Sequence, residues 1–199
     1  MPNETFTNQI LNWQVSTNLI RGGLNRSNFE ETSEGLFMSS GFVYETAEQA
    51  QRAFDGEEER IIYSRFSNPT IGIFEDRMAL LEGAQNCRAT ATGMAAVYAS
   101  LAATLKAGDR LVASRALFGS CDYVCRQLFP RHGVETVMVD GTNISEWERA
   151  LRKPTSAVFL ETPSNPQLDI IDLSAVSEIA HKAGARVIVD NITATPIFQ

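Results

Sequence analysis

The sequence has a deficit of positive charge and lacks any long apolar run. Its 199 residues include 17 Lys and Arg against 24 Asp and Glu, giving a formal net charge of −7. Nucleic acids and anionic membranes are normally bound by basic surfaces, so this balance argues against both partners and leaves room only for a local basic site. The N-terminus has no basic start followed by an apolar stretch, and no segment approaches the length of a membrane span. We therefore expect a cytoplasmic protein.

Cysteine and histidine are also scarce. The three cysteines, Cys87, Cys121 and Cys125, are odd in number, and no pair with zinc-type spacing is matched by a second pair. Reduced thiols that pack as small apolar side chains are the expected state. His132 and His181 lie in or near helical patterns, without a partner at metal-ligand or triad spacing. The sequence therefore predicts no metal site.

The remaining composition is that of an ordinary globular protein, with 44% hydrophobic and 21% charged residues. The length suffices for one large domain or for a domain with an arm. Residues 1–60 are polar and irregular, and we interpret them as an arm that packs onto something else. Residues 61–199 are expected to form the domain proper.

Beyond about residue 85, short apolar runs alternate with helical patterns. This rhythm predicts an α/β fold with a mainly parallel sheet, because parallel strands are joined by helical crossovers. The expected strands are 87–91, 110–113, 135–139, 157–160 and 186–189. The expected helices are 46–54, 70–81, 94–105, 120–131, 144–151 and 173–183.

Asp190 closes an apolar run and so lies at the carboxyl end of a predicted strand. In doubly wound sheets, ligands bind at that edge. A buried carboxylate there can stabilise the protonated ring nitrogen of a cofactor. An Asp at this position also commonly caps the next element, and the pattern alone leaves both interpretations open.

Thr92-Gly93-Met94 lies where a predicted strand passes into a predicted helix. Gly93 permits close approach of the main chain, and the amides and the dipole at a helix start favour an anion. A tight turn without any ligand explains the same three residues.

Four further side chains are suited to a cofactor. Tyr63 and Arg65 alternate along an extended segment and so project to the same side, where a hydroxyl and a guanidinium can bind a phosphate. Phe118 follows a predicted strand and can stack on a planar ring, whereas Asn165, in a turn between two prolines, can hydrogen-bond a phenolic oxygen. The alternatives are a surface Tyr/Arg pair, a core aromatic and an Asn that serves only the backbone.

Together these motifs resemble the Cys/Met-metabolism family of pyridoxal-phosphate (PLP) enzymes. The motifs, in the order of the family, are Tyr63-Ser-Arg65-Phe-Ser-Asn-Pro-Thr70, Ala91-Thr-Gly-Met-Ala-Ala96, Glu161-Thr-Pro-Ser-Asn-Pro166 and Ala185-Arg-Val-Ile-Val-Asp-Asn191. The resemblance runs from about residue 17 to residue 199. It implies the PLP-dependent transferase fold of type I, with 61–199 forming an incomplete large domain after the arm.

The resemblance implies two groups of phosphate contacts. Thr92, Gly93 and Met94 would hold the phosphate of pyridoxal 5'-phosphate at the helix start. Tyr63 and Arg65 would reach across a subunit interface to the phosphate of the neighbouring site, which makes the protein a homo-oligomer.

The resemblance also implies contacts to the cofactor ring. Phe118 would stack on the ring, Asn165 would hydrogen-bond its phenolic oxygen, and Asp190 would act as the electron-sink partner of its nitrogen. Many relatives have Tyr where this chain has Phe118, so only the stacking role carries over, because Phe cannot transfer a proton. Thr193 would support Asp190, although the usual Asp-Asn-Thr is here Asp-Asn-Ile-Thr.

Within the family, the stretch 26–44 is similar to the branch that converts O-succinylhomoserine and sulfide to homocysteine and succinate in methionine biosynthesis. The implied partners are therefore a small amino-acid substrate and sulfide. Cystathionine γ-synthase chemistry, methionine or cystathionine γ-lyase chemistry, and a non-catalytic anion-binding α/β module are the alternatives.

The family also requires a Schiff-base lysine beyond Asp190 and a C-terminal arginine for the substrate carboxylate. The only lysines here are Lys106, Lys153 and Lys182, each in or near the end of a predicted helix. We therefore expect the sequence to be the N-terminal portion of a longer enzyme and to be inactive by itself.

Overall fold

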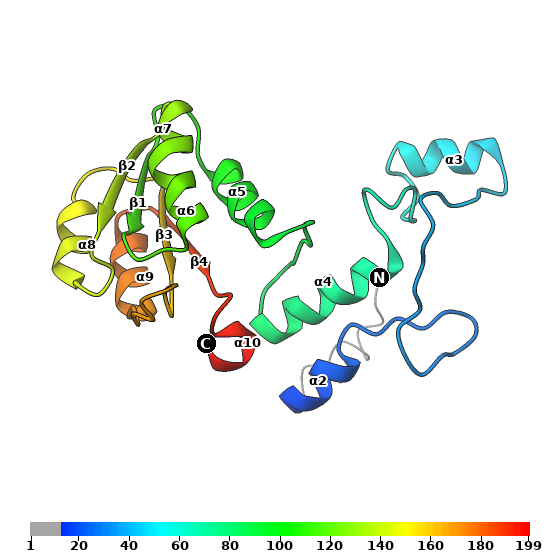
Figure 1. The fold of residues 1–199 in the computed structure, drawn as a ribbon. Helices are drawn as coiled ribbons and strands as arrows, with labels where there is room; N and C mark the ends of the chain where they lie inside the picture. Colours follow the sequence, from blue (N-terminus) through cyan, green and yellow to red (C-terminus); the bar gives the residue numbers. More distant parts are fainter. Residues whose placement is uncertain (1–12) are drawn as a thin grey trace. The chain divides into compact units, whose positions relative to one another are not determined.

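The computed structural model describes residues 13–199, and the chain divides into two compact units between Ala89 and Thr90 (Figure 1). The expected boundary at residue 60 stays a prediction. Among the described residues, no helix has both the length and the apolarity that crossing a membrane requires.

In its described part, from residue 13 onward, the first unit contains three helices: α2 (Val15–Arg21), α3 (Ala47–Phe54) and α4 (Pro69–Glu82). The helices α3 and α4 were expected, and their starts are set by side chains that accept main-chain hydrogen bonds: Thr46 from Gln49, and Asn68 from Thr70. Helix α2 was not expected, because it lies within residues 1–60, which the sequence predicts to be irregular.

Helix α2 packs on α4 through the two glycines that follow it. Gly23 has a φ of +68°, and a Cβ there would lie 2.8 Å from the carbonyl oxygen of Ile73, so this close approach requires glycine. Arg77 of α4 donates to the carbonyl oxygen of Gly22 at 2.7 Å and pairs with Glu34. The pairing lowers the pKa of Glu34 through a hydrogen bond to its carboxylate.

The second unit is a four-stranded parallel sheet in the order β2-β1-β3-β4. The strands are β1 (Arg110–Ser114), β2 (Glu135–Val139), β3 (Ala157–Glu161) and β4 (Arg186–Asp190). The helices are α5 (Gly93–Thr104), α6 (Gly119–Tyr123), α7 (Phe129–Arg131), α8 (Ile144–Ala150), α9 (Leu173–Lys182) and α10 (Thr195–Phe198), with a π-helical turn, η1 (Val124–Leu128), between α6 and α7. This confirms the predicted α/β class and four of the five predicted strands.

The remaining predicted strand, 87–91, is wrong. Residues 87–91 are neither helix nor strand, although their sequence has a short apolar alternation. A strand is stabilised by pairing, and none of β1 to β4 pairs with this segment.

The predicted helix 120–131 is interrupted rather than continuous. Its middle turn, η1, has π-helical hydrogen bonding, and Pro130 follows it at the start of α7. Proline has no N–H to donate to the preceding turn, and a wider turn accommodates that loss.

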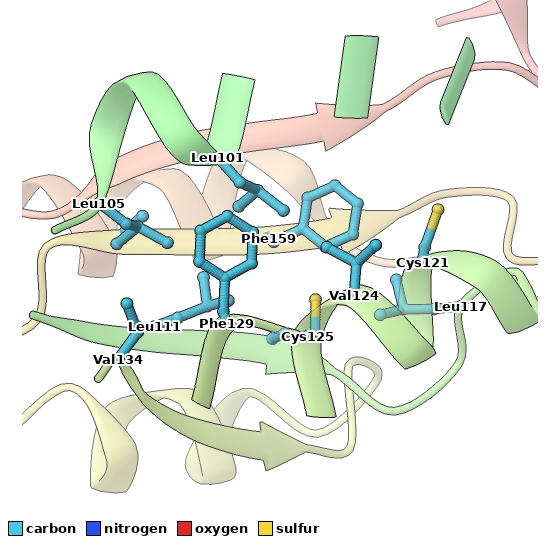
Figure 2. Close-up of a cluster of buried hydrophobic side chains, with 12 residues drawn as sticks. Leu101, Leu105, Leu111, Leu117, Cys121, Val124, Cys125, Phe129, Val134 and Phe159 are labelled. Carbon is cyan, nitrogen blue, oxygen red and sulfur yellow. The ribbon is translucent and has the colours of Figure 1, made fainter. Parts of the chain in front are cut away.

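Helices cover both faces of the sheet because alternate side chains of each strand point to opposite faces. On one face, Leu111 and Phe159 pack against α5, α6 and α7 (Figure 2). On the other face, Val112 and Leu160 pack against α8 and α9, where Trp147 is fully buried. Glu161 and Asp190 follow the alternation of the first face, which places both carboxylates on the side of α5.

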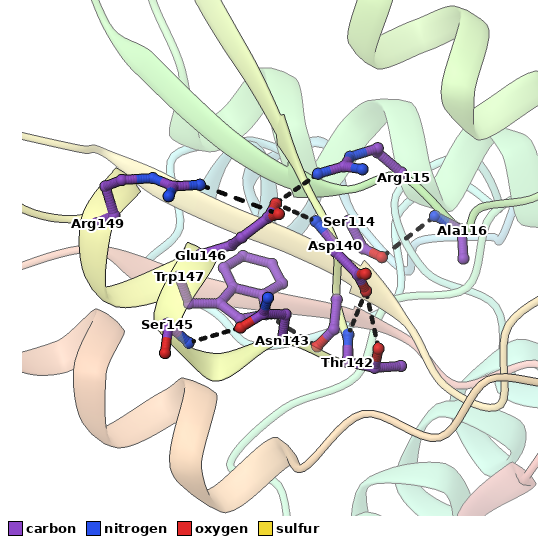
Figure 3. Close-up of polar contacts among 11 residues, drawn as sticks. Ser114, Arg115, Ala116, Asp140, Thr142, Asn143, Ser145, Glu146, Trp147 and Arg149 are labelled. Carbon is purple, nitrogen blue, oxygen red and sulfur yellow. Dashed lines mark hydrogen bonds and ion pairs between the residues drawn. The ribbon is translucent and has the colours of Figure 1, made fainter.

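A polar network closes the carboxyl ends of β1 and β2 (Figure 3). Glu146 of α8 accepts a hydrogen bond from the main-chain N–H of Asp140 at 2.8 Å and pairs with Arg115, and Trp147 donates to the carbonyl oxygen of Gly141 at 3.0 Å. The hydrogen bond from the Asp140 amide lowers the pKa of Glu146. The network therefore fixes the loop after β2, whereas the pocket forms at the ends of β3 and β4, beside Phe118 and Cys121.

Candidate functional site

The strand order creates a switch point between β1 and β3. The chain runs from β1 outward to β2 and then returns to the other side of β1 as β3. Ligands of open α/β sheets bind outside the carboxyl ends of the strands at such a point. A pocket of about 540 Å³ lies there. Its walls come from Gly93, Met94, Ala96, Val97, Ser100, Phe118, Cys121, Phe159, Glu161, Asn165, Ile188, Val189, Asp190, Asn191 and Ile192.

Asp190 is held in the pocket wall by two contacts. Its Oδ1 accepts a hydrogen bond from the main-chain N–H of Ile192 at 3.1 Å, and its Oδ2 lies 3.8 Å from the Sγ of Cys121. The Cys121 thiol is a weak donor to this carboxylate. Burial, reinforced by the negative charge of Asp190, raises the pKa of Cys121 to about 12. The thiol therefore stays protonated and can keep donating.

Glu161 is a second carboxylate in the same wall. It lies beside Asp190 in the strand register, and only 1% of its surface is exposed. Its Oε2 accepts a hydrogen bond from the main-chain N–H of Phe118 at 2.6 Å. Burial raises the pKa of Glu161, the Phe118 amide opposes the rise, and the charge of Asp190 adds to it. The ring of Phe118 also lines the pocket and is half-exposed.

The start of α5 forms another part of the wall. Thr92 is the helix cap: its side chain accepts from the N–H of Ala95 at 3.1 Å, whereas Gly93 and Met94 face the pocket. Amides in the first turn of a helix have no intrahelical acceptor. Apart from its chain neighbours and the backbone of its own helix, a Cβ on Gly93 would meet no atom within 4 Å, so the space beside these amides is open to an anion.

Asn165 reaches the pocket from the loop after β3. Hydrogen bonds fix this loop: Thr162 accepts from the N–H of Ile171 at 3.0 Å, and Ser164 accepts from the N–H of Asp169 at 3.0 Å. The Thr162–Pro163 and Asn165–Pro166 peptide bonds are cis.

Four of the predicted site residues do not line this pocket, and one of them is Thr92, the cap of α5. Thr193 lies in a separate hollow of about 370 Å³ with Thr162 and Pro163. Tyr63 and Arg65 belong to the first unit, where both are exposed and the Arg65 guanidinium lies 5.7 Å from the centre of the Tyr63 ring. The predicted support of Asp190 by Thr193 stays a prediction, and so does the contact of Tyr63 and Arg65 with the cofactor phosphate of a neighbouring subunit.

All three lysines lie at the amino edge of the sheet, opposite the carboxyl edge that bears the pocket. Lys106 falls between α5 and β1, Lys153 between α8 and β3, and Lys182 ends α9 before β4. Connections that lead into parallel strands lie at the amino edge, away from the Asp190 carboxylate. That none of the three is the Schiff-base lysine stays a prediction.

Comparison with known proteins identifies the pocket's cofactor class. The sequence model described as Cys/Met metabolism PLP-dependent enzyme matches residues 16–199. The chain belongs to this family. An O-succinylhomoserine sulfhydrylase of Mycobacterium tuberculosis is 56% identical over 180 residues, which cover 90% of this chain and 44% of that protein. An L-methionine gamma-lyase of Porphyromonas gingivalis is 38% identical over 182 residues, covering 91% of this chain and 46% of that protein.

Solved structures agree with this Cys/Met-metabolism membership. A crystal structure from Campylobacter jejuni that contains N'-pyridoxyl-lysine-5'-monophosphate matches with a TM-score of 0.86 at 30% identity, covering 93% of this chain and 46% of that one. A cystathionine gamma-lyase from Lactobacillus plantarum matches with a TM-score of 0.82 at 29% identity, covering 92% and 46%. The chain thus spans about half the length of the relatives it matches, and its fold is that of PLP enzymes of fold type I.

The pocket fits the cofactor of the Cys/Met-metabolism family, pyridoxal 5'-phosphate. Its volume lies in the range of small-molecule sites. The open space at the start of α5 suits the phosphate, the Asp190 carboxylate suits the ring nitrogen, and Phe118 offers an aromatic face.

Two polar residues of the pocket wall, Glu161 and Cys121, are not among the predicted site residues. The sequence places Glu161 at the start of a motif without a role of its own, and it predicts that Cys121 packs as a small apolar side chain. The alternation 157, 159, 161 was a signal for Glu161, because it puts that carboxylate on the same face as Asp190. No signal links Cys121 to Asp190, which lies 69 residues further along the chain.

Proposed function

We propose that the protein, as expressed from its complete gene, catalyses a PLP-dependent γ-replacement in which O-succinylhomoserine and sulfide give homocysteine and succinate. The observation that carries this proposal is the Asp190 carboxylate in a pocket bordered by a helix start and an aromatic ring. The 56% identity to an O-succinylhomoserine sulfhydrylase favours this reaction over others of the family.

The cofactor, when bound, supplies an electron sink for the electrons that remain after the substrate loses its α-proton. In the proposed arrangement, Gly93 and Met94 bind the phosphate with main-chain N–H groups, and Asn165 hydrogen-bonds the phenolic oxygen. Phe118 covers one face of the ring. Asp190 holds a proton on the ring nitrogen, because a nearby negative charge favours the protonated form.

The proposal includes a homo-oligomer in which Tyr63 and Arg65 complete the phosphate site of a neighbouring copy. Both side chains are exposed, and Arg65 also lies 5.0 Å from the centre of the Phe66 ring. A guanidinium held beside aromatic rings is suited to bidentate binding of a phosphate.

Product analysis tests the reaction. The protein is loaded with PLP and incubated with O-succinylhomoserine and either sulfide or cysteine. Homocysteine formed with sulfide, faster than cystathionine forms with cysteine, supports the proposal. Preferential formation of cystathionine would assign the synthase reaction instead.

A γ-lyase is the second candidate, favoured by the 38% identity to an L-methionine gamma-lyase. It would release a keto acid, ammonia and a thiol from methionine without any added nucleophile. The same preparation given methionine alone therefore distinguishes the two reactions.

A further inference from the structure

Glu161 is a buried carboxylate at the end of β3. It is 1% exposed, and its Oε2 accepts a hydrogen bond from the Phe118 amide at 2.6 Å, while a main-chain hydrogen bond from Asn165 also lowers the pKa of this carboxyl group. The next strand places Asp190 directly beside it. A carboxyl group that is buried next to a second carboxylate costs folding free energy. Simple packing would be better served there by an apolar side chain.

The placement of Glu161 gives a reason to keep such a costly group. Its carboxylate joins the end of β3 to the loop that carries Phe118, across 43 positions of sequence. Phe118 has no side-chain polar atom, so it is held through its main chain: its N–H donates to Glu161, and its carbonyl oxygen accepts from the N–H of Asp122 at 3.0 Å. Glu161 and Asp190 are neighbours in the paired strands β3 and β4, and the hydrogen bond from the Phe118 amide connects the Phe118 loop to this strand pair.

We propose that Glu161 is a positioning residue for the cofactor. Its hydrogen bond to the Phe118 amide fixes the position of the Phe118 ring relative to the site beside Asp190 where the cofactor ring would bind. The inference rests on the proposed function, because it assumes PLP in this pocket. It assigns Glu161 no contact with the cofactor and no proton transfer.

The test compares three variants of the protein expressed from its complete gene. Glu161→Met keeps the length of the side chain and removes the acceptor, and Glu161→Gln keeps an acceptor oxygen. Glu146→Ala is the matched control, because the Glu146 carboxylate also accepts a main-chain N–H at a strand end of this sheet but does not line the pocket. Each apo form is titrated with PLP, and affinity, induced circular dichroism, amide hydrogen exchange at Phe118 and melting temperature are measured.

We expect Glu161→Met to melt at or above the wild-type temperature, to exchange the Phe118 amide faster, and to bind PLP about tenfold more weakly with a smaller dichroic band per bound cofactor. Glu161→Gln should restore affinity and dichroism, and Glu146→Ala should leave both unchanged.

Two results would overturn the proposal. Wild-type affinity and dichroism in Glu161→Met would show that the contact does not position the ring. A Glu161→Met variant that unfolds or melts far lower would show that Glu161 is a structural residue. By contrast, an absence of PLP binding in the wild type and in Glu146→Ala alike would remove the proposed function itself.

Discussion

The thiol of Cys121 lies 3.8 Å from Oδ2 of Asp190 and donates to the carboxylate proposed to face the cofactor ring. The thiol is 1% exposed, and burial together with the Asp190 charge raises its pKa to about 12. One helical turn further on, Cys125 is fully buried, and burial raises its pKa to about 12 as well. Both thiols are thus kept as neutral packing groups.

The first prediction concerns thiol reactivity. At pH 8, a thiol with a pKa of about 12 is present as thiolate in a fraction on the order of one in ten thousand. Iodoacetamide should therefore label the less buried Cys87 first, and it should label Cys121 and Cys125 only after denaturation. Peptide mass spectrometry of native and urea-treated protein measures this order. Equal labelling of Cys121 in both samples would contradict the geometry.

The same thiols predict a loss of stability in alkali. Between pH 9, where an ordinary thiol ionises, and about 12, the unfolded chain releases a proton that the folded Cys125 retains. Stability should therefore fall as pH rises through this window, by up to about 1.4 kcal/mol per pH unit for each thiol. A Cys125→Ala variant is less stable than wild type at pH 8 because of its cavity, and the gap should narrow at pH 10. Urea unfolding at both values measures the gap, and a constant gap contradicts the prediction.

Glu161 gives a test of the same sign at acidic pH, because burial raises its pKa as well. Below pH 4.5 its carboxyl group is protonated in both the folded and the unfolded chain. As pH rises, the unfolded chain ionises first because the folded pKa is raised, and the folded state loses stability. Glutamine does not ionise, so Glu161→Gln should gain stability relative to wild type between pH 4.5 and pH 7. Unfolding of the apo forms at both pH values measures this difference, and a difference that shrinks with pH would count against a buried carboxyl group.

The sequence predicted the elements whose signals are local. Thr46 and Asn68 begin helices as caps, Gly83 ends α4 in a left-handed conformation with a φ of 60°, and apolar runs mark β1 to β4. The segment 87–91 failed because pairing, which decides whether a strand forms, is not a local property. The contacts of Glu161 with Phe118 and of Cys121 with Asp190 could not be predicted either, because they join residues far apart in the sequence that only the folded sheet brings together.

Asp190 itself should be essential for turnover and dispensable for folding. In Asp190→Asn, the amide oxygen can still accept from the N–H of Ile192, so the strand end should be retained. The neutral amide cannot stabilise a protonated ring nitrogen, and we expect turnover to fall by about three orders of magnitude or more. Steady-state kinetics at saturating PLP, with circular dichroism as the folding control, tests this. Near-normal kcat in a folded variant would mean that Asp190 is only a cap.

The proposed oligomer predicts complementation between inactive subunits. Arg65→Ala and Asp190→Ala should each be nearly inactive in the protein expressed from its complete gene. If Arg65 acts on the neighbouring copy's site, a hybrid pair has one site with both residues intact and one with neither. Equal mixing gives half hybrids, so activity should return to roughly a quarter of wild type per subunit.

A pair of variants from the same pocket provides the control for this experiment. Phe118 and Asp190 both line the pocket of one chain, so every site in a Phe118→Ala and Asp190→Ala hybrid lacks one of them. Mixing these two variants should give no activity above the mean of the separate preparations. If subunit exchange is demonstrated and the Arg65 mixture stays as inactive as its components, Arg65 does not act across an interface. The exposed Tyr63 and Arg65 pair would then act within its own chain, and neither residue would require the protein to be an oligomer.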